Sequence, residues 1–506
     1  MKRHKLRKRA ALLLAAVIMF ASLTVLHANG AQLQSEQTFG HISEHKAFYE
    51  TYGGAVDKIA NELWNMETEV DVYEYRIPAE ELGTLVNTAI HTHPELFYVC
   101  GRYYGTQRYD RVTKKDYLSK VVFHWGKVVF DENGNDTGTE ELFDEAQVLE
   151  MRSEFFEKAQ WYLDMVDDDM SDFEKALVLH DALAINSEYL ISEEIYELMV
   201  NGRGKCYGYS EVYSYLLAQV GVNSEIVESE EMYHQWNKVE IDGEYYHVDV
   251  TWDDPYPPDM PGYAHHDFFL LSDSAIESLK MPHTGYESDF PSNSTRFDNC
   301  DFHNIDTQFC YANGSFYAVD NRGEGETGKS LVRYDTVSDT YEKAWDFSDE
   351  YWDAGNGYVW FSMSMSLAEQ DDYLYMNSEN SVYVYDTRTG ELNGFAVNDS
   401  GSSFYGLRVI GGKVYAVLAE EPQMGGELYY VGDCLAREEQ PAVIIGDVDG
   451  DGTVTVNDVT ALQMYLAEYF DPTPEQLAAA DVNRDGKVNI RDVTQLQRFL
   501  AEFVSL

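Results

Sequence analysis

Basic residues are scarce in this chain of 506 residues. Lysine and arginine together number 36, against 89 aspartates and glutamates, and the formal net charge is −53. A charge of this sign repels nucleic acid and anionic membranes, by the same counterion effect that attracts basic proteins to them. The composition therefore argues against a nucleic-acid partner, and it favours solubility and cation binding.

Only the first segment of the chain carries a long apolar run. The basic stretch "MKRHKLRKR" precedes apolar residues from Ala10 to Leu26, and small residues follow at Ala28 and Ala31. This pattern is typical of a secretory signal peptide, here residues 1–28. An uncleaved anchor stays open as an alternative, because a span needs about 20 apolar residues. We expect a secreted protein with no membrane span after cleavage.

Cysteine is also rare, with five residues in the chain. Five cysteines are too few for a disulfide framework in a secreted protein of this size, and an odd number leaves at least one unpaired. Cys300 and Cys310 could pair, and Cys206 is the cysteine that we expect to be free. The motifs Gly-x-Ser-x-Gly and His-Glu-x-x-His are absent.

The remaining sequence divides into regions of different pattern. Residues 32–145 mix helical and strand patterns and predict an N-terminal α+β extension, and in residues 146–290 helical patterns give way to strands. Residues 300–437 contain short strand signals broken by glycine, asparagine and aspartate. They form three related meander units, which predict an all-β, propeller-like region but are few for a closed propeller. The whole is expected to be a multidomain protein.

Two oxygen-rich loops lie at the far end of the chain, 34 residues apart. Each has carboxylate or amide oxygens at loop positions 1, 3 and 5, glycine at position 6 and a carboxylate at position 12, which is a ligand order suited to calcium. The predicted ligands are Asp447, Asp449, Asp451, the Thr453 carbonyl and Asp458 in the first loop, and Asp481, Asn483, Asp485, the Lys487 carbonyl and Asp492 in the second.

This duplicated loop and helix over residues 444–506 resembles a type I dockerin domain, a small α-helical calcium-binding module. The resemblance implies two calcium ions and binding to a cohesin domain of a scaffoldin, as in a cell-surface-attached cellulosome that degrades plant polysaccharides. Coupling of calcium binding to folding is expected, since clustered carboxylates repel one another without a cation. By the family's pattern, the cohesin-binding residues would be Val456, Asn457, Gln463, Met464, Ile490, Arg491, Gln497 and Arg498.

Cys206 stands between a glycine-rich approach, "GRGK", and a helical pattern. Apolar or aromatic residues recur after it at the spacing of a helix with one buried face, from Tyr209 to Val220, and Gly221 is a plausible end. The thiol is thus expected at a helix N-terminus, where the helix dipole and unpaired N–H groups favour a thiolate.

A histidine and an aspartate follow in a predicted hairpin. Asp242-Gly243 between strand-forming residues indicates a two-residue turn, and this register sets His234 opposite Thr251 and Trp236 opposite Asp249. His234 and Asp249 would then be diagonal neighbours on one face, with Cβ atoms about 7–8 Å apart. The competing histidine, His247, would face Lys238, which makes it a poorer base.

The segments "SDFEKALVLHDALAINSEYL", "GKCYGYSEVYSYLL" and "HQWNKVEIDGEYYHVDVTWDDP" resemble the transglutaminase-like superfamily of papain-like thiol enzymes. The resemblance covers about 150–270 and implies an α+β catalytic core with Cys206, His234 and Asp249 as catalytic residues. It assigns no side chain to the oxyanion hole.

Three functions remain open from the sequence. The first is a cysteine protease, amidase or acyltransferase that acts on amide bonds of a protein or peptide substrate. The second is a non-catalytic module that uses the same fold to bind protein or glycan, and the third is a structural part of the scaffoldin complex. We favour the first, in which Cys206 attacks a carbonyl, His234 accepts the thiol proton and Asp249 fixes the imidazole.

Overall fold

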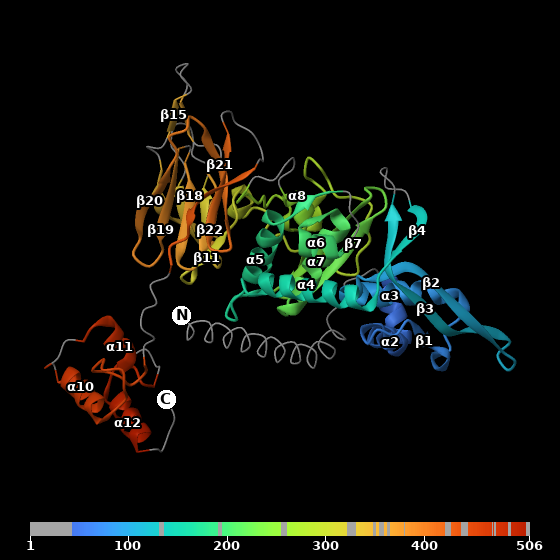
Figure 1. The fold of residues 1–506 in the computed structure, drawn as a ribbon, viewed down its shortest axis with the longest axis horizontal. Coiled ribbons are helices and arrows are strands. Elements are labelled where there is room, and N and C mark those ends of the chain that lie inside the picture. Colours follow the sequence, from blue (N-terminus) through green and yellow to red (C-terminus); the bar gives the residue numbers. More distant parts are fainter. Residues whose placement is uncertain are drawn as a thin grey trace, which may run out of the picture. The chain divides into compact units, whose positions relative to one another are not determined.

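The computed structural model of the chain forms two compact units, Met1–Cys434 and Leu435–Leu506, shown as a ribbon in Figure 1. It describes residues 43–130, 136–190, 195–254, 261–320, 330–347, 351–353, 359–361, 365–378, 380–419, 427–436, 444–467, 469, 472–483 and 487–501. The predicted signal peptide and Asp485 lie outside these residues. Among them, no helix has both the length and the apolar character to cross a membrane.

The first part of the larger unit mixes helices and an antiparallel sheet, as its sequence pattern predicts. Its helices are α2 (Ser43–Trp64) and α3 (Leu82–Thr92), and its strands are β1 (Glu69–Asp71), β2 (Val99–Asp110), β3 (Lys115–Phe130) and β4 (Asp136–Leu142). The sheet has the order β1-β3-β2, and β4 also pairs with β3. Buried Ile59, Leu63, Val86 and Val121 belong to one core that joins the helices to this sheet.

The middle part places helices against a second antiparallel sheet of order β10-β9-β8-β7. The helices are α4 (Glu145–Leu163), α5 (Asp172–Ile185), α6 (Ile195–Asn201), α7 (Cys206–Gln219), α8 (Val250–Asp253) and α9 (Asp273–Ile276). The strands are β5 (Glu188–Tyr189), β6 (Arg203–Gly204), β7 (Ser224–Ser229), β8 (His234–Ile241), β9 (Glu244–Val248) and β10 (Phe269–Leu271).

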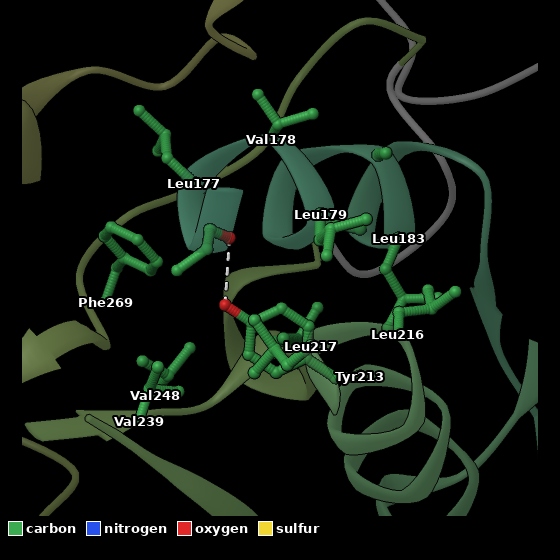
Figure 2. Close-up of a cluster of buried hydrophobic side chains, with 14 of the residues drawn as sticks. Leu177, Val178, Leu179, Leu183, Tyr213, Leu216, Leu217, Val239, Val248 and Phe269 are labelled. Atoms are coloured by element: carbon green, nitrogen blue, oxygen red, sulfur yellow. Dashed lines mark hydrogen bonds between the residues drawn. The ribbon is translucent and has the colours of Figure 1, made fainter. Parts of the chain in front are cut away.

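Helix α7 is the central helix of this part. Tyr213, Leu216 and Leu217 are fully buried, and they pack with Leu179 and Leu183 of α5 and with Val239 and Val248 of the sheet. Figure 2 shows this cluster, in which the Tyr213 hydroxyl donates a hydrogen bond of 2.9 Å to the Ala176 carbonyl. The apolar spacing after Cys206 therefore predicted the helix, but α7 is buried beyond the predicted face, because Gly208, Ser210 and Glu211 are buried as well.

The β-rich part consists of successive meanders, in which strands that follow one another in sequence pair with one another. The first two sheets contain β11 (Cys310–Ala312), β12 (Ser315–Asp320), β13 (Ser330–Asp335) and β14 (Thr340–Asp346), then β17 (Leu367–Gln370), β18 (Tyr373–Asn377), β19 (Ser381–Asp386) and β20 (Glu391–Val397). A third sheet contains β21 (Ser403–Ile410), β22 (Lys413–Ala419) and β23 (Leu428–Asp433), and β15 (Tyr351–Asp353) pairs with β16 (Val359–Phe361). The described strands make no closed propeller or barrel, in keeping with the small number of units.

The β-rich part shares a core with the helical part. Phe302, Phe309 and Phe316 belong to the same buried cluster as Phe269, and the Phe309 N–H donates to Asp181 of α5 at 2.6 Å. Cys310 begins the first of these strands and is buried with a free thiol, and Cys300 is also free. The Cys300–Cys310 pairing that the sequence left open is therefore not formed, because the strand directs Cys310 into the core.

The described residues of the smaller unit form the helices α10 (Val456–Leu466), α11 (Pro474–Ala480) and α12 (Ile490–Leu500). Equivalent residues of its two halves form one core, with Val459 and Leu462 from α10 and Val493 and Leu496 from α12. The sequence repeat is thus a structural repeat.

Candidate active site and calcium loops

Cys206 is the first residue of α7. Steric contacts explain why glycines precede it. Gly202 has φ +65°, and a Cβ there would lie 2.3 Å from the Asn186 carbonyl oxygen. A Cβ on Gly204 would press against Leu198 at 3.1 Å. The glycine-rich approach lets the chain pass closely beside neighbouring backbone and enter α7 with the thiol at its first turn.

The hairpin has the predicted register as far as its ladder extends. Asn237 pairs with Val248 and Lys238 pairs with His247, and the turn residues Asp242 and Gly243 have φ of 54° and 84°, as a two-residue hairpin turn requires. Beyond Val248 the strand stops. His234 does not pair with Thr251, nor Trp236 with Asp249, because the chain turns into α8.

Asp249 is the N-cap of α8, and its Oδ1 accepts hydrogen bonds from the N–H groups of Thr251 and Trp252 at 3.1 and 3.3 Å. Its Oδ2 lies 2.6 Å from Nε2 of His234. The helix cap thus fixes the carboxylate plane, and the predicted His234–Asp249 pair forms by a different local structure from the one expected.

The electrostatics of these groups favour a thiolate and an imidazolium. Burial raises the pKa of the Cys206 thiol, but the hydrogen bond to His234 and the charge of that ring outweigh burial and hold the pKa below its ordinary value. Burial lowers the pKa of His234, while the charge and hydrogen bond of Asp249 raise it more, to about 10. Burial also raises the pKa of Asp249, but the charge and hydrogen bonds of His234 and His283 hold it well below its usual range.

Two indoles enclose the His234 ring. Trp236 and Trp252 lie on it with ring centroids 5.6 and 5.2 Å away and interplanar angles of 16° and 27°. Their faces attract a cationic ring and exclude water from it. Tyr233, directly before His234, is 92% exposed, so the turn into β8 is open to solvent while the ring is buried.

The contacts of His247 do not suit a general base for the Cys206 thiol. Its Nδ1 accepts a hydrogen bond of 2.8 Å from the Trp236 indole N–H, and its Nε2 lies 2.8 Å from Asp273. Burial lowers the pKa of His247 to about 4, although Asp273 opposes this. The preference for His234 over His247, made from strand register, agrees with these contacts.

The structure adds His283, which sequence reasoning missed. Nε2 of His283 lies 2.8 Å from Oδ2 of Asp249, the same oxygen that contacts His234. His283 is fully buried, in a loop 34 residues beyond Asp249. No periodicity or motif marks it, so the sequence offered no signal that could have found it.

A second buried polar network, also missed, supports α8 from its other end. His180 of α5 lies between Asp181 and Asp253, at 2.8 and 3.1 Å, and Asp253 is the last residue of α8. His266 contacts Asp181 at 2.9 Å and the Ile305 carbonyl at 2.8 Å. The network links α8 to the start of the β-rich part.

The first predicted calcium loop has the expected arrangement. Carboxylate oxygens of Asp447, Asp449 and Asp451 lie within 4.8 Å of one another. Asp458 is buried at the start of α10, and its carboxylate accepts hydrogen bonds from the N–H groups of Asp449 and Thr455. Three convergent carboxylates without a basic partner inside the loop fit a calcium ion.

The second loop repeats the contacts that the structure describes. Asp492 is buried and accepts hydrogen bonds from the N–H groups of Asn483 and Asn489, at 3.1 and 2.8 Å. Asp492 and Asp458 therefore have the same position and the same partners in the two halves. The predicted partner-binding residues all have exposed side chains: Val456, Asn457, Gln463, Met464, Ile490, Arg491, Gln497 and Arg498.

Comparison with known proteins identifies one part of the chain. Residues 445–501 match the family described as Dockerin type I domain, and none of the curated proteins matches the chain. A crystal structure of a TGase shares 12% identity with a TM-score of 0.19, over 23% of this chain and 35% of that one. PorZ of Porphyromonas gingivalis shares 12% identity with a TM-score of 0.17, over 40% and 25%.

The extracellular domain of the hybrid two-component system BT4673 from B. thetaiotaomicron shares 12% identity with a TM-score of 0.15, over 38% of this chain and 18% of that one. This chain thus spans about a third or less of each of these three structures. The calcium loops and the family match agree on the C-terminal unit: residues 445–501 are a dockerin type I domain, a module that implies docking to a cohesin.

Proposed function

We propose that this protein is a secreted thiol hydrolase or acyltransferase that acts on amide bonds of a protein or peptide, and that its dockerin attaches it to a scaffoldin cohesin. The observation that carries the proposal is the buried His234, whose Nε2 lies 2.6 Å from Oδ2 of Asp249 and whose ring also interacts with the Cys206 thiol. A thiol, a base and an orienting carboxylate in this order are the parts that nucleophilic acyl transfer requires.

In the proposed reaction the Cys206 thiolate attacks the amide carbonyl carbon, and the carbonyl π electrons move to the oxygen. The tetrahedral intermediate collapses as the C–N bond breaks, and the leaving amine takes the proton from the His234 imidazolium. The product is an acyl-thioester on Cys206. Water or a second amine then attacks it, with His234 as general base, and the thiolate leaves.

The start of α7 supplies hydrogen-bond donors for the developing oxyanion. The first helical hydrogen bond of α7 runs from the Tyr209 N–H to the Lys205 carbonyl, so the N–H of Cys206 precedes the intrahelical ladder. Such N–H groups, together with the helix dipole, stabilise negative charge next to the thiol.

The calcium loops support the docking half of the proposal. The same buried aspartate with the same two backbone partners occurs in each half, at Asp458 and Asp492, which favours two calcium ions. Val456 and Ile490, at equivalent positions, are 70% and 65% exposed. Apolar side chains presented in this way suit a protein partner.

The test uses the full chain with calcium. Release of peptides from casein and incorporation of a fluorescent amine into casein are measured for wild type, Cys206→Ala and Cys310→Ala. We expect one of the two activities in wild type and in Cys310→Ala, where a core thiol is removed, and loss of it in Cys206→Ala. Peptide release identifies a hydrolase, and amine incorporation identifies an acyltransferase.

A second measurement does not require the substrate to be known. Alkylation of Cys206 by iodoacetamide is followed by mass spectrometry across the pH range, in wild type and His234→Ala. We expect a wild-type inflection below the ordinary thiol value of about 8.5, which moves upward in the variant. A slow reaction with an ordinary inflection in both would refute an activated thiol and favour the non-catalytic binding module.

A further inference from the structure

Asp249 carries more hydrogen bonds than the proposed catalytic set needs. Its Oδ1 accepts from the N–H groups of Thr251 and Trp252. Its Oδ2 meets two imidazoles, Nε2 of His234 at 2.6 Å and Nε2 of His283 at 2.8 Å. The carboxylate is fully buried, so these four donors, rather than water, determine how its negative charge is distributed.

The orientation of Asp249 does not depend on His283. The two amides of α8 fix Oδ1, and His234 already contacts Oδ2, which together define the carboxylate plane. What His283 adds is a second donor on the oxygen that faces His234. Two donors on one carboxylate oxygen share its charge, and each hydrogen bond is weaker than it would be alone.

The surroundings of His283 hold its ring in one orientation. Its Nδ1 is buried and has no hydrogen-bond partner among the residues that the structure describes, so the hydrogen of the ring belongs on Nε2, facing Asp249. Trp236, Trp252 and Phe268 pack around the ring, with centroids 4.6, 4.4 and 5.3 Å away. His283 is therefore held inside an aromatic enclosure with its Nε2–H directed at Asp249.

We infer that His283 is a positioning residue that shares the charge of Asp249 with His234 and thereby limits how strongly Asp249 retains the proton of the His234 imidazolium. This inference rests on the proposed function, in which His234 must give that proton to the leaving amine. Without the second donor, the whole charge of Oδ2 would act on His234. The imidazolium would persist to higher pH and release its proton less readily.

The titratable groups in contact with His234, among the described residues, are Cys206, Asp249 and His283. His247 is engaged elsewhere, because it accepts a hydrogen bond from the Trp236 indole N–H and contacts Asp273. Cys206 and Asp249 are unchanged in a His283 variant. A change in the titration of His234 would therefore report the loss of the His283 donor.

The experiment compares two variants of similar size in the full chain. His283→Gln keeps an N–H donor at the position of Nε2, whereas His283→Met has a similar length and no donor. His283→Leu serves as a second variant without a donor. Iodoacetamide alkylation of Cys206 is measured across the pH range in each, and circular dichroism checks the fold.

We expect the upper inflection of the profile, at which His234 loses its proton, to move up by about one pH unit in the Met and Leu variants, since one hydrogen bond to a charged group is lost. The Gln variant should remain close to wild type. An unchanged or lowered upper inflection in Met and Leu would overturn the inference. The inference would also be overturned if only the His283→Gln variant folded, because His283 would then be needed for folding.

Failure of the proposed function has a different signature. In that case wild type itself is alkylated slowly, with a single inflection near the ordinary thiol pKa, whatever residue occupies position 283. An activated wild-type thiol with no response to His283→Met would refute the role of His283 alone.

Discussion

Replacing Asp249 with Asn tests the central contact of the proposed site with little disturbance of the fold. Asn is a good N-cap, and its side-chain oxygen can keep the hydrogen bonds from Thr251 and Trp252. Its amide group then points at His234 and His283, where two ring N–H donors had met a carboxylate oxygen. His234 must lose its Nε2 hydrogen to accept a bond from the amide, and it then presents Nδ1–H to Cys206.

The magnitude follows from the two protonation states. The pKa of His234 at about 10, against an ordinary value near 6.5, corresponds to a preference on the order of 5 kcal/mol for the imidazolium. Asp249→Asn removes the charge behind that preference and leaves burial, which favours neutral imidazole. Without the imidazolium, the Cys206 thiol loses the hydrogen bond and the charge that hold its pKa below the ordinary value, while burial still raises that pKa, so most of the thiol is protonated near pH 6.

A thiolate of higher pKa is also a better nucleophile, by about threefold for each unit of pKa, which offsets part of the lost thiolate population. Since the thiolate population near pH 6 falls about tenfold for each unit by which the pKa rises, the alkylation rate there should fall by about threefold per unit. The loss should shrink as the pH rises, and near pH 10 the variant should react at least as fast as wild type.

The assay is iodoacetamide labelling of Cys206, followed by mass spectrometry from about pH 5 to 10, with thermal unfolding as the check on folding. Cys434, which is half-buried, supplies an internal reference, because Asp249 is not among the groups that perturb its pKa. Superimposable profiles for wild type and Asp249→Asn would refute the reasoning. An alkylation rate that is lower by the same factor at every pH would indicate a damaged fold instead of a changed protonation state.

Three further outcomes are expected. Chelation of calcium should unfold the isolated unit 435–506, measured by circular dichroism, and an unchanged spectrum would contradict the calcium assignment. Leu217→Ala should lower the free energy of unfolding by about 2–5 kcal/mol in chemical denaturation, against less than about 0.5 kcal/mol for the exposed Val337→Ala. Because folding lowers the pKa of Cys206, ionisation of this thiol stabilises the folded state. This contribution is complete above about pH 8.5 and is lost as the pH falls. The difference in melting temperature between wild type and Cys206→Ala should thus grow with pH up to that value, and a constant difference would contradict an activated thiol.

Sequence patterns predicted the features that depend on neighbours along the chain. The apolar spacing after Cys206 fixed a buried helix, Asp242-Gly243 fixed a hairpin and its register, and the two loops beginning at Asp447 and Asp481 fixed a repeated module. These features follow from local backbone preferences and from side-chain periods of two or 3.6 residues.

The same reasoning was wrong where the chain left a regular element. It extended the hairpin to Thr251, although α8 begins after Asp249, and it allowed a disulfide between Cys300 and Cys310. It gave no sign of His283. The first two cases concern the place where the chain leaves or enters a regular element, and the third concerns a contact between residues 34 apart in sequence. In all three, packing and the hydrogen bonds of buried polar groups decide the structure.

By itself, then, the sequence determined the helix that starts at Cys206, the strand that starts at His234 and the dockerin with its calcium loops. Only the tertiary structure decided how the carboxylate of Asp249 is held: by the first turn of α8 on one oxygen and by two histidines on the other. The physical reason is that a local pattern specifies an element and its buried face, whereas a buried charge is stabilised by whichever donors the whole fold brings to it.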